Sequence, residues 1–232
     1  MWNKPLKKAI FTLDLDNKYP KSITDITYPL IKSYADKIGA SFTIISERKF
    51  PEFPATYEKF QIYQLAQDMN NDWNIFFDCD ALIHPDTPDI TNIIPFESVA
   101  HHAKDYSGFR WKDNRFFQRD GRRIGSCNWF TMASSLNIEL WKPVDDITQD
   151  DIANAIIPIL NEQKAGVIPI RLIDDYVCSY NIAKYGLKFT TVQEEMGKMG
   201  MDSLGFFFHL YAITEEEKTV KMNNQLKIWG LV

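Results

Sequence analysis

Short apolar runs alternate with longer amphipathic segments in the first part of the chain. The runs at 9–15, 41–46 and 74–77 are too short for helices and rich in β-branched and aromatic residues, so they predict buried strands. Between them, segments 24–38 and 57–69 carry apolar residues at helical spacing and predict helices. The order strand, helix, strand, helix, strand is that of a doubly wound α/β sheet.

The second part of the chain continues this alternation less regularly. Its patterns predict strands at 98–103, 127–133, 187–192 and 206–211, a loop at 197–205, and helices at 136–141, 174–185 and 150–164, the last interrupted at Pro158. Since no linker, repeat or second boundary is found, we expect a single domain over 1–232. Residues 1 to about 100 would form its nucleotide-sized half.

Composition and charge are those of an ordinary globular protein, with a high aromatic share of 14% that suggests aromatic-lined pockets. The net charge of −5 argues against a surface devoted to nucleic acid, although it leaves a local basic patch open. The scattered cysteines Cys79, Cys127 and Cys178 indicate buried thiols rather than a disulfide framework or a zinc site. We find no signal peptide or membrane span, so the expected location is cytoplasmic.

The strand predicted at 74–77 ends in two carboxylates, Asp78 and Asp80. In open α/β sheets, ligands bind at the carboxyl ends of the strands. Residues two apart on an extended backbone point to the same side, so these carboxylates would repel each other unless a cation or a proton intervened. The stretch therefore predicts a metal site.

Several stretches together resemble the glycosyltransferases of the GT-A fold, close in layout to the retaining family 8. They are a strand ending in Thr12-Leu13-Asp14, a helical lysine at Lys59, the element Asp78-Cys79-Asp80, the small-residue strand at 125–133, the pair Asp174-Asp175, and a late His209 after an apolar strand. The resemblance implies a mixed sheet flanked by helices. It also implies a donor-binding half over about 1–100 and an acceptor-binding half over about 101–232.

The same resemblance implies a metal-dependent transfer of a sugar from a nucleotide diphosphate sugar, with UDP as the expected nucleotide and a retaining outcome. Asp78, Asp80 and His209 would bind Mn²⁺ or Mg²⁺. Carboxylates suit either ion, and the imidazole tilts the choice toward Mn²⁺. The donor would be bound by Thr12, Leu13, Asp14, Lys59, Asp78, Cys79, Lys218 and Lys221.

Two further sets of residues carry open alternatives. Asp174 and Asp175 are the expected catalytic residues, one of them meeting the acceptor or the transferred sugar, but they could equally cap a helix. The arginine-rich stretch 110–123 is either a solvated loop or a groove for the acceptor, which would be a glycan, a protein or a modified nucleic acid. The expected acceptor-binding residues are Arg110, Trp111, Arg115 and Asn128.

Some single residues also have plain structural readings. Taken alone, His209 could be a histidine of the core. Asp14 could be a turn residue at the end of a strand, and Lys59 could be a lysine on the solvated face of a helix. The family often places a diphosphate-binding lysine in a His-x-x-Gly-x-x-Lys element, whereas here Lys218, Lys221 and Lys227 are all candidates.

Two other functions fit the carboxylate pair. In a haloacid-dehalogenase-type phosphatase, an aspartate nucleophile follows an apolar strand, and Asp78 and Asp80 match that spacing. Against it, Ala81 stands where that motif has glycine, and the stretch comes third in strand order. The remaining alternative is a non-catalytic module that binds a nucleotide sugar.

Overall fold

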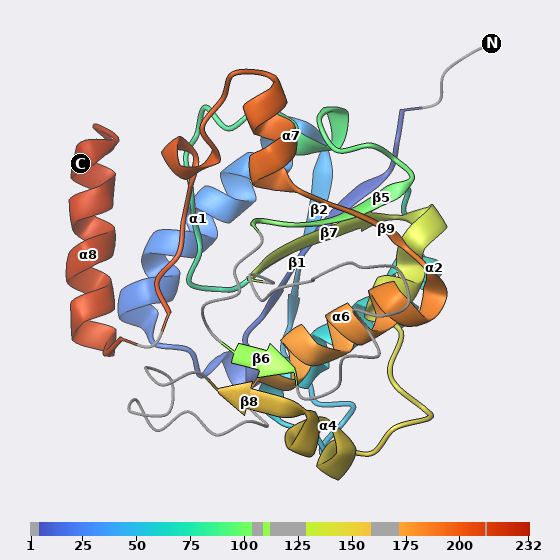
Figure 1. The fold of residues 1–232 in the computed structure, drawn as a ribbon. Coiled ribbons are helices and arrows are strands. Elements are labelled where there is room, and N and C mark those ends of the chain that lie inside the picture. The colour runs from blue at the N-terminus through green and yellow to red at the C-terminus, as the bar shows by residue number, and fades with distance from the viewer. Residues whose placement is uncertain (1–4, 104–108, 112–128, 159–171, 212) are drawn as a thin grey trace.

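The computed structural model describes residues 5–103, 109–111, 129–158, 172–211 and 213–232. Its centre is a six-stranded sheet in the order β2-β1-β3-β7-β5-β9 (Figure 1). The strands are β1 (Lys8–Leu13), β2 (Ala40–Ile45), β3 (Trp73–Phe77), β5 (Ser98–His101), β7 (Phe130–Ser134) and β9 (Lys188–Thr191).

The sheet is mixed. β1 pairs in parallel with β2 and β3, and β5 pairs in parallel with β9, whereas β7 runs antiparallel to both of its neighbours. The predicted α/β class, with a mixed sheet flanked by helices, is therefore confirmed. The division into a donor half and an acceptor half stays a prediction.

Helices cover both faces of the sheet. The helices α1 (Lys21–Ile38) and α7 (Val192–Lys198) pack on one face, against the core that holds Ile10, Ile75 and Phe77. The opposite face, with Phe11 and Phe76, is covered by α2 (Ile62–Met69), α4 (Gln149–Ala155) and α6 (Ile173–Tyr185) and by the 3₁₀ helices η2 (Ala55–Gln61) and η4 (Ser135–Trp141). Strand residues alternate between the two cores, as period-two geometry requires.

Two small sheets and a peripheral helix complete the fold. β4 (Leu82–Ile83) pairs antiparallel with β10 (Phe207–Phe208), and β6 (Phe109–Trp111) pairs antiparallel with β8 (Ile156–Pro158). The helix α8 (Glu215–Ile228) stands at the edge of the molecule beside α1 (Figure 1). The short 3₁₀ helices are η1 (Leu15–Asn17), η3 (Ile90–Asn92) and η6 (Ser203–Gly205).

Several predicted elements were wrong in extent or type, among them the helix at 136–141, which is the 3₁₀ helix η4. The helix at 57–69 is a 3₁₀ turn followed by α2, and the loop at 197–205 begins inside α7. The strand at 206–211 is reduced to two residues because its partner β4 has only two. The helix at 150–164 ends at Ala155, where the chain enters β8; a residue before proline is pushed out of the helical region, and Pro158 follows two β-branched residues.

In the described part of the chain, no helix is both long and apolar enough to cross a membrane.

The central strand gives a stability test. Ile75 in β3 is 0% exposed, so Ile75→Ala should lower the free energy of unfolding by about 3 kcal/mol, through lost burial and a residual cavity. The same substitution at Ile228, which is 76% exposed, should change it by less than about 0.5 kcal/mol. Urea unfolding measures both. Equal losses in the two variants would contradict the assignment of β3 to the core.

Candidate functional site

The two carboxylates lie on a tight turn at the carboxyl end of β3. The N–H of Asp78 donates to the carbonyl of Trp129 at 2.7 Å, and the N–H of Ala81 donates back to the carbonyl of Asp78 at 3.0 Å. The hydroxyl of Thr27 on α1 donates to the carbonyl of Cys79 at 2.5 Å. The turn is thus anchored beside β7 and onto α1, which fixes the backbone between Asp78 and Asp80.

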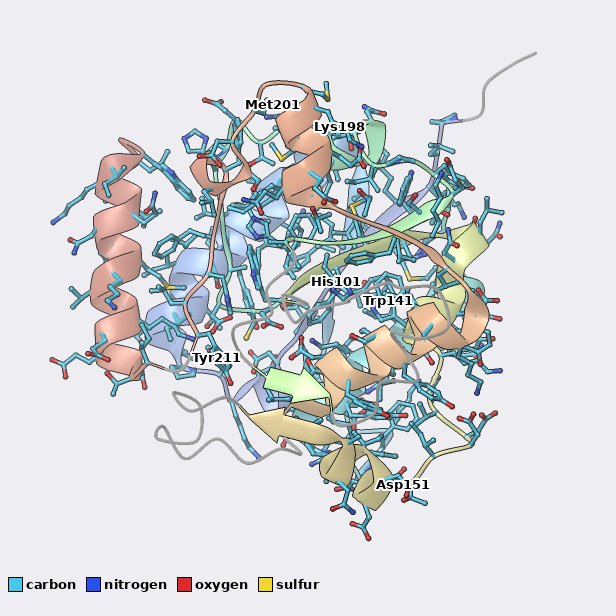
Figure 2. All side chains as sticks on the ribbon, viewed as in Figure 1. His101, Trp141, Asp151, Lys198, Met201 and Tyr211 are labelled. Carbon is cyan, nitrogen blue, oxygen red and sulfur yellow. The ribbon has the colours of Figure 1, made fainter. Side chains whose placement is uncertain are left out.

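His209 reaches this turn from far along the chain. The segment between α7 and α8 descends from the top of the view toward the start of α8 (Figure 1), and Figure 2 shows Met201 and Tyr211 at well-separated points along it. The β10–β4 pairing fixes the part of the segment before His209 next to the turn. Nε2 of His209 lies 3.1 Å from Oδ1 of Asp80 and 3.6 Å from Oδ2 of Asp78.

These distances suit one divalent ion. Oxygen ligands lie about 2.1 Å from Mg²⁺, so two ligands of one such ion lie up to about 4.2 Å apart. Both distances from His209 fall within that limit, and the ligand atoms of the three residues all lie within a somewhat wider 4.8 Å of one another. Two carboxylates and an imidazole suit Mn²⁺ or Mg²⁺, and three protein ligands leave room for phosphate oxygens or water.

The second oxygen of Asp80 is occupied by other groups. The ammonium of Lys218, in the first turn of α8, contacts Oδ2, and the hydroxyl of Tyr19 donates to the same atom at 2.6 Å. Burial alone would raise the pKa of Asp80, but the hydrogen bond from His209 and the charges of His209 and Lys218 outweigh it and hold the pKa well below its usual range. Asp80 therefore stays ionised with Oδ1 directed toward His209.

A buried lysine links the turn to α6. Nζ of Lys59 on η2 lies 2.6 Å from Oδ2 of Asp174 and 3.9 Å from Oδ1 of Asp78, and it sits 4.5 Å from the centre of the Phe76 ring. The Lys59 side chain is only 2% exposed. Burial lowers its pKa, but Asp174 and Asp78 together raise it further, so the net pKa is above the usual range and the ammonium stays charged. The solvated-helix reading of Lys59 is therefore wrong.

Asp78 differs electrostatically from Asp80. Its side chain is 34% exposed, yet burial of the carboxylate and the nearby charges of Asp80 and Asp174 raise its pKa against the opposing effect of Lys59 and His209. Asp78 therefore takes up a proton more readily than an ordinary aspartate, whereas Asp80 resists protonation. Burial contributes more to the raised pKa of Asp78 than the repulsion from Asp80 that the sequence predicts.

Asp14 forms a second polar cluster next to the turn. Its oxygens accept from the hydroxyl of Tyr28 at 2.7 Å and from the N–H of Tyr19 at 2.8 Å, and its own N–H donates to the carbonyl of Ile45. Because Tyr19 also donates to Asp80, one residue connects both clusters. Burial and the carboxylates they donate to raise the pKa of Tyr19 and of Tyr28, so both hydroxyls keep their protons.

Of the remaining residues expected to bind the nucleotide sugar, some lie at the carboxylate turn and others do not. Thr12 and Leu13 end β1 directly before Asp14, and Cys79 lies buried between the two carboxylates, where burial and those charges raise its thiol pKa. Lys221 is exposed on α8 and Lys227 lies further along the same helix, so of the three candidate lysines the structure brings Lys218 to the turn.

Asp174 and Asp175 lie in the first turn of α6, and both are buried. The N-cap position belongs to Leu172, so neither aspartate is the N-cap residue, but both lie where acidic side chains favour a helix start. The expected acceptor residues are not brought to the turn by any described contact. Arg110 and Trp111 belong to β6, with side chains outside the description, and Arg115 and Asn128 lie outside the described residues. Cys79 and Cys178 are buried, as expected, and Cys127 lies outside the described residues.

Sequence reasoning missed Tyr19, Tyr28 and Trp129. The first two form the hydrogen bonds to Asp14 and Asp80 just described. The indole of Trp129 stacks on the imidazole of His209, with ring centroids 5.0 Å apart and an interplanar angle of 9°. No local pattern identifies these residues, because their role depends on contacts between distant parts of the chain.

No protein-family model and no curated protein sequence matches the chain. Solved structures of similar fold exist, and three of them are described below. A glycosyltransferase involved in glycosylation of the major capsid of PBCV-1 is 13% identical with a TM-score of 0.49, over 93% of this chain and 99% of that one. A197 from STIV is 15% identical with a TM-score of 0.42, over 81% and 82%.

The third is a mutant of Drosophila β-1,4-galactosyltransferase 7 in complex with manganese, UDP-Gal and xylobiose. It is 13% identical with a TM-score of 0.44, over 92% of this chain and 79% of that one. Because all three TM-scores lie below 0.5, no conclusion about activity follows from these similarities.

The two carboxylates should affect stability in opposite directions. In EDTA at pH 7.5, Asp78→Asn should raise the free energy of unfolding, because the folded-state pKa of Asp78 is raised and its ionisation costs stability. Asp80→Asn should lower it by about 3 kcal/mol, because it breaks a buried ion pair.

The pH dependence follows from the same shifts. The cost of ionised Asp78 should fade as pH falls from the raised pKa toward the ordinary value of 3.8, and the contribution of Asp80 should persist until pH falls below that value. Urea unfolding across this range measures both. Effects of the same sign at pH 7.5 would contradict the assigned charge states.

Proposed function

We propose that the chain is a metal-dependent glycosyltransferase that moves a sugar from a nucleotide diphosphate sugar, with UDP as the expected nucleotide. The observation that carries the proposal is the convergence of Asp78, Asp80 and His209 at the carboxyl edge of the sheet. When bound there, a Mn²⁺ or Mg²⁺ ion would stabilise the negative charge that develops on the diphosphate as the sugar bond breaks.

The charges around this cluster favour an anionic ligand. Asp78, Asp80 and Asp174 are offset in part by the ammonium groups of Lys59 and Lys218, both nearly fully buried. A divalent ion would turn the net charge of these groups positive, which suits a diphosphate. Lys218 is our candidate for the contact to the diphosphate, since its ammonium already lies at the edge of the cluster.

The Asp14 cluster is the proposed place for the nucleoside. Asp14 sits after β1, the strand next to β3 in the sheet, and is fixed by Tyr19 and Tyr28. Its location at the carboxyl edge agrees with a role on the base or the ribose. Thr12, Leu13 and Cys79 would line the path between the nucleoside and the diphosphate.

Asp174 and Asp175 are the proposed residues for the transferred sugar or the acceptor. The ammonium of Lys59 contacts both Asp174 and Asp78. A ligand that changes the charge around one of these carboxylates would therefore also change the interaction of Lys59 with the other. Three further parts of the proposal rest on the sequence alone. They are the retaining outcome, the cytoplasmic location, and the acceptor contacts by Arg110, Trp111, Arg115 and Asn128.

The phosphatase and the binding module remain the alternatives. In a phosphatase Asp78 would attack a phosphate and Asp80 would donate a proton, but Oδ2 of Asp80 is taken up by Lys218 and Tyr19, and its lowered pKa disfavours an acid. Mn²⁺-dependent release of UDP from UDP-sugars would support the transferase. Metal-dependent hydrolysis of p-nitrophenyl phosphate would support the phosphatase. A thermal shift on addition of a nucleotide sugar, without turnover, would support the binding module.

Loss of either carboxylate should abolish transfer. Asp78→Ala and Asp80→Ala should each reduce Mn²⁺-dependent release of UDP by at least about 100-fold, because loss of even a second-shell partner costs a metal site 10–100-fold. The control is Asp36→Ala, whose side chain is 61% exposed on α1 and should retain full activity. Full activity in both Asp78→Ala and Asp80→Ala would reject the proposal.

The lysine assignment has its own test. At saturating Mn²⁺, Lys218→Met should raise the KM for the nucleotide sugar about 10-fold, since a hydrogen bond to a charged group contributes about 1.5–3 kcal/mol. Lys221→Met, on the exposed side of the same helix, should leave KM unchanged. The reverse result would move the diphosphate contact to Lys221.

A further inference from the structure

Trp129 lies at the junction between the sheet and the carboxylate turn. Phe130, the first residue of β7, pairs with Phe77, the last residue of β3, so Trp129 is placed opposite Asp78. The carbonyl of Trp129 accepts from the N–H of Asp78 at 2.7 Å. The backbone of this one residue therefore helps to fix the first carboxylate.

The side chain of Trp129 contacts the third residue of the cluster. Its indole lies nearly parallel to the imidazole of His209, at 9° and 5.0 Å between centroids. It is 9% exposed and also packs against His102, with ring centroids 4.7 Å apart. An aromatic ring held in this way limits the rotation of the imidazole that lies on it.

His102 gives the indole a rigid and uncharged support. It is 4% exposed, and its backbone is held by hydrogen bonds to Phe130 and from Gln193, each at 3.0 Å. Burial, with the nearby His209, lowers the pKa of His102 to about 4, so its ring is neutral at physiological pH. The support adds no positive charge that would oppose a cation at the cluster.

Histidines that bind metals are normally oriented by a hydrogen bond from their other ring nitrogen to a carboxylate, a carbonyl or water. Here stacking on Trp129 sets the ring plane, with Nε2 of His209 facing Asp80 and Asp78. We propose that Trp129 is a positioning residue of the metal centre, which holds His209 in its metal-binding orientation. This inference rests on the proposed metal site and does not depend on which reaction the site performs.

Metal affinity tests the proposal without reference to activity. In an EPR titration with Mn²⁺, Trp129→Leu should bind about 10-fold more weakly than the unaltered protein, as expected for loss of a group that orients a metal ligand. Trp129→Phe, which keeps an aromatic face, should recover most of the affinity. The control is Trp141→Leu. Trp141 is 0% exposed on the α6 side of the sheet (Figure 2), so its loss should reduce stability but not Mn²⁺ affinity.

A double-mutant cycle separates positioning from general damage. His209→Ala should weaken Mn²⁺ binding by itself, and adding Trp129→Leu to it should cause no further loss, because the ligand that Trp129 orients is gone. Independent, additive losses, or unchanged affinity in Trp129→Leu, would overturn the positioning role and leave the metal site standing. Unchanged affinity in His209→Ala would overturn the metal site and this inference together.

Discussion

The repulsion between Asp78 and Asp80 is the constraint around which this fold is arranged. Both carboxylates lie at the end of a buried strand, on a turn whose backbone is fixed by Trp129 and Thr27. The backbone of the turn cannot carry the two residues apart without breaking those hydrogen bonds. The negative charge must therefore be balanced in place, and a buried charge that is not balanced costs several kcal/mol.

The balancing groups come from three separate parts of the chain. Lys59 arrives on a 3₁₀ turn before α2, His209 follows a two-residue strand, and Lys218 lies in the first turn of α8. The long segment between α7 and α8 is what carries His209 to the carboxylate turn. The two carboxylates end up unequal, with the pKa of Asp78 raised and that of Asp80 lowered.

The sheet was predictable from sequence because its signals are local. The apolar runs at 9–15, 41–46 and 74–77 do form the strands β1, β2 and β3, although β2 lies at the edge of the sheet and only Ile45 in it is buried. The carboxylates that follow 74–77 do lie at a shared edge with Asp14 and His209. The contacts that tune the site were not predictable. The hydrogen bond of Tyr19 to Asp80 and the stacking of Trp129 on His209 join residues 61 and 80 positions apart in sequence, and no periodicity or motif records such a contact.

The late position of Lys218 has a consequence for how the protein is made. During synthesis from the N-terminus, β1, α1, β2 and β3 can assemble while α8 is still absent, so the carboxylate turn forms before His209 and Lys218 exist. Until then Lys59 alone offsets the charge of the turn among the groups described above. The final docking of the 206–228 region should thus be driven partly by electrostatic attraction to a preformed acidic edge, which would make the last step of folding sensitive to salt and to free divalent ions.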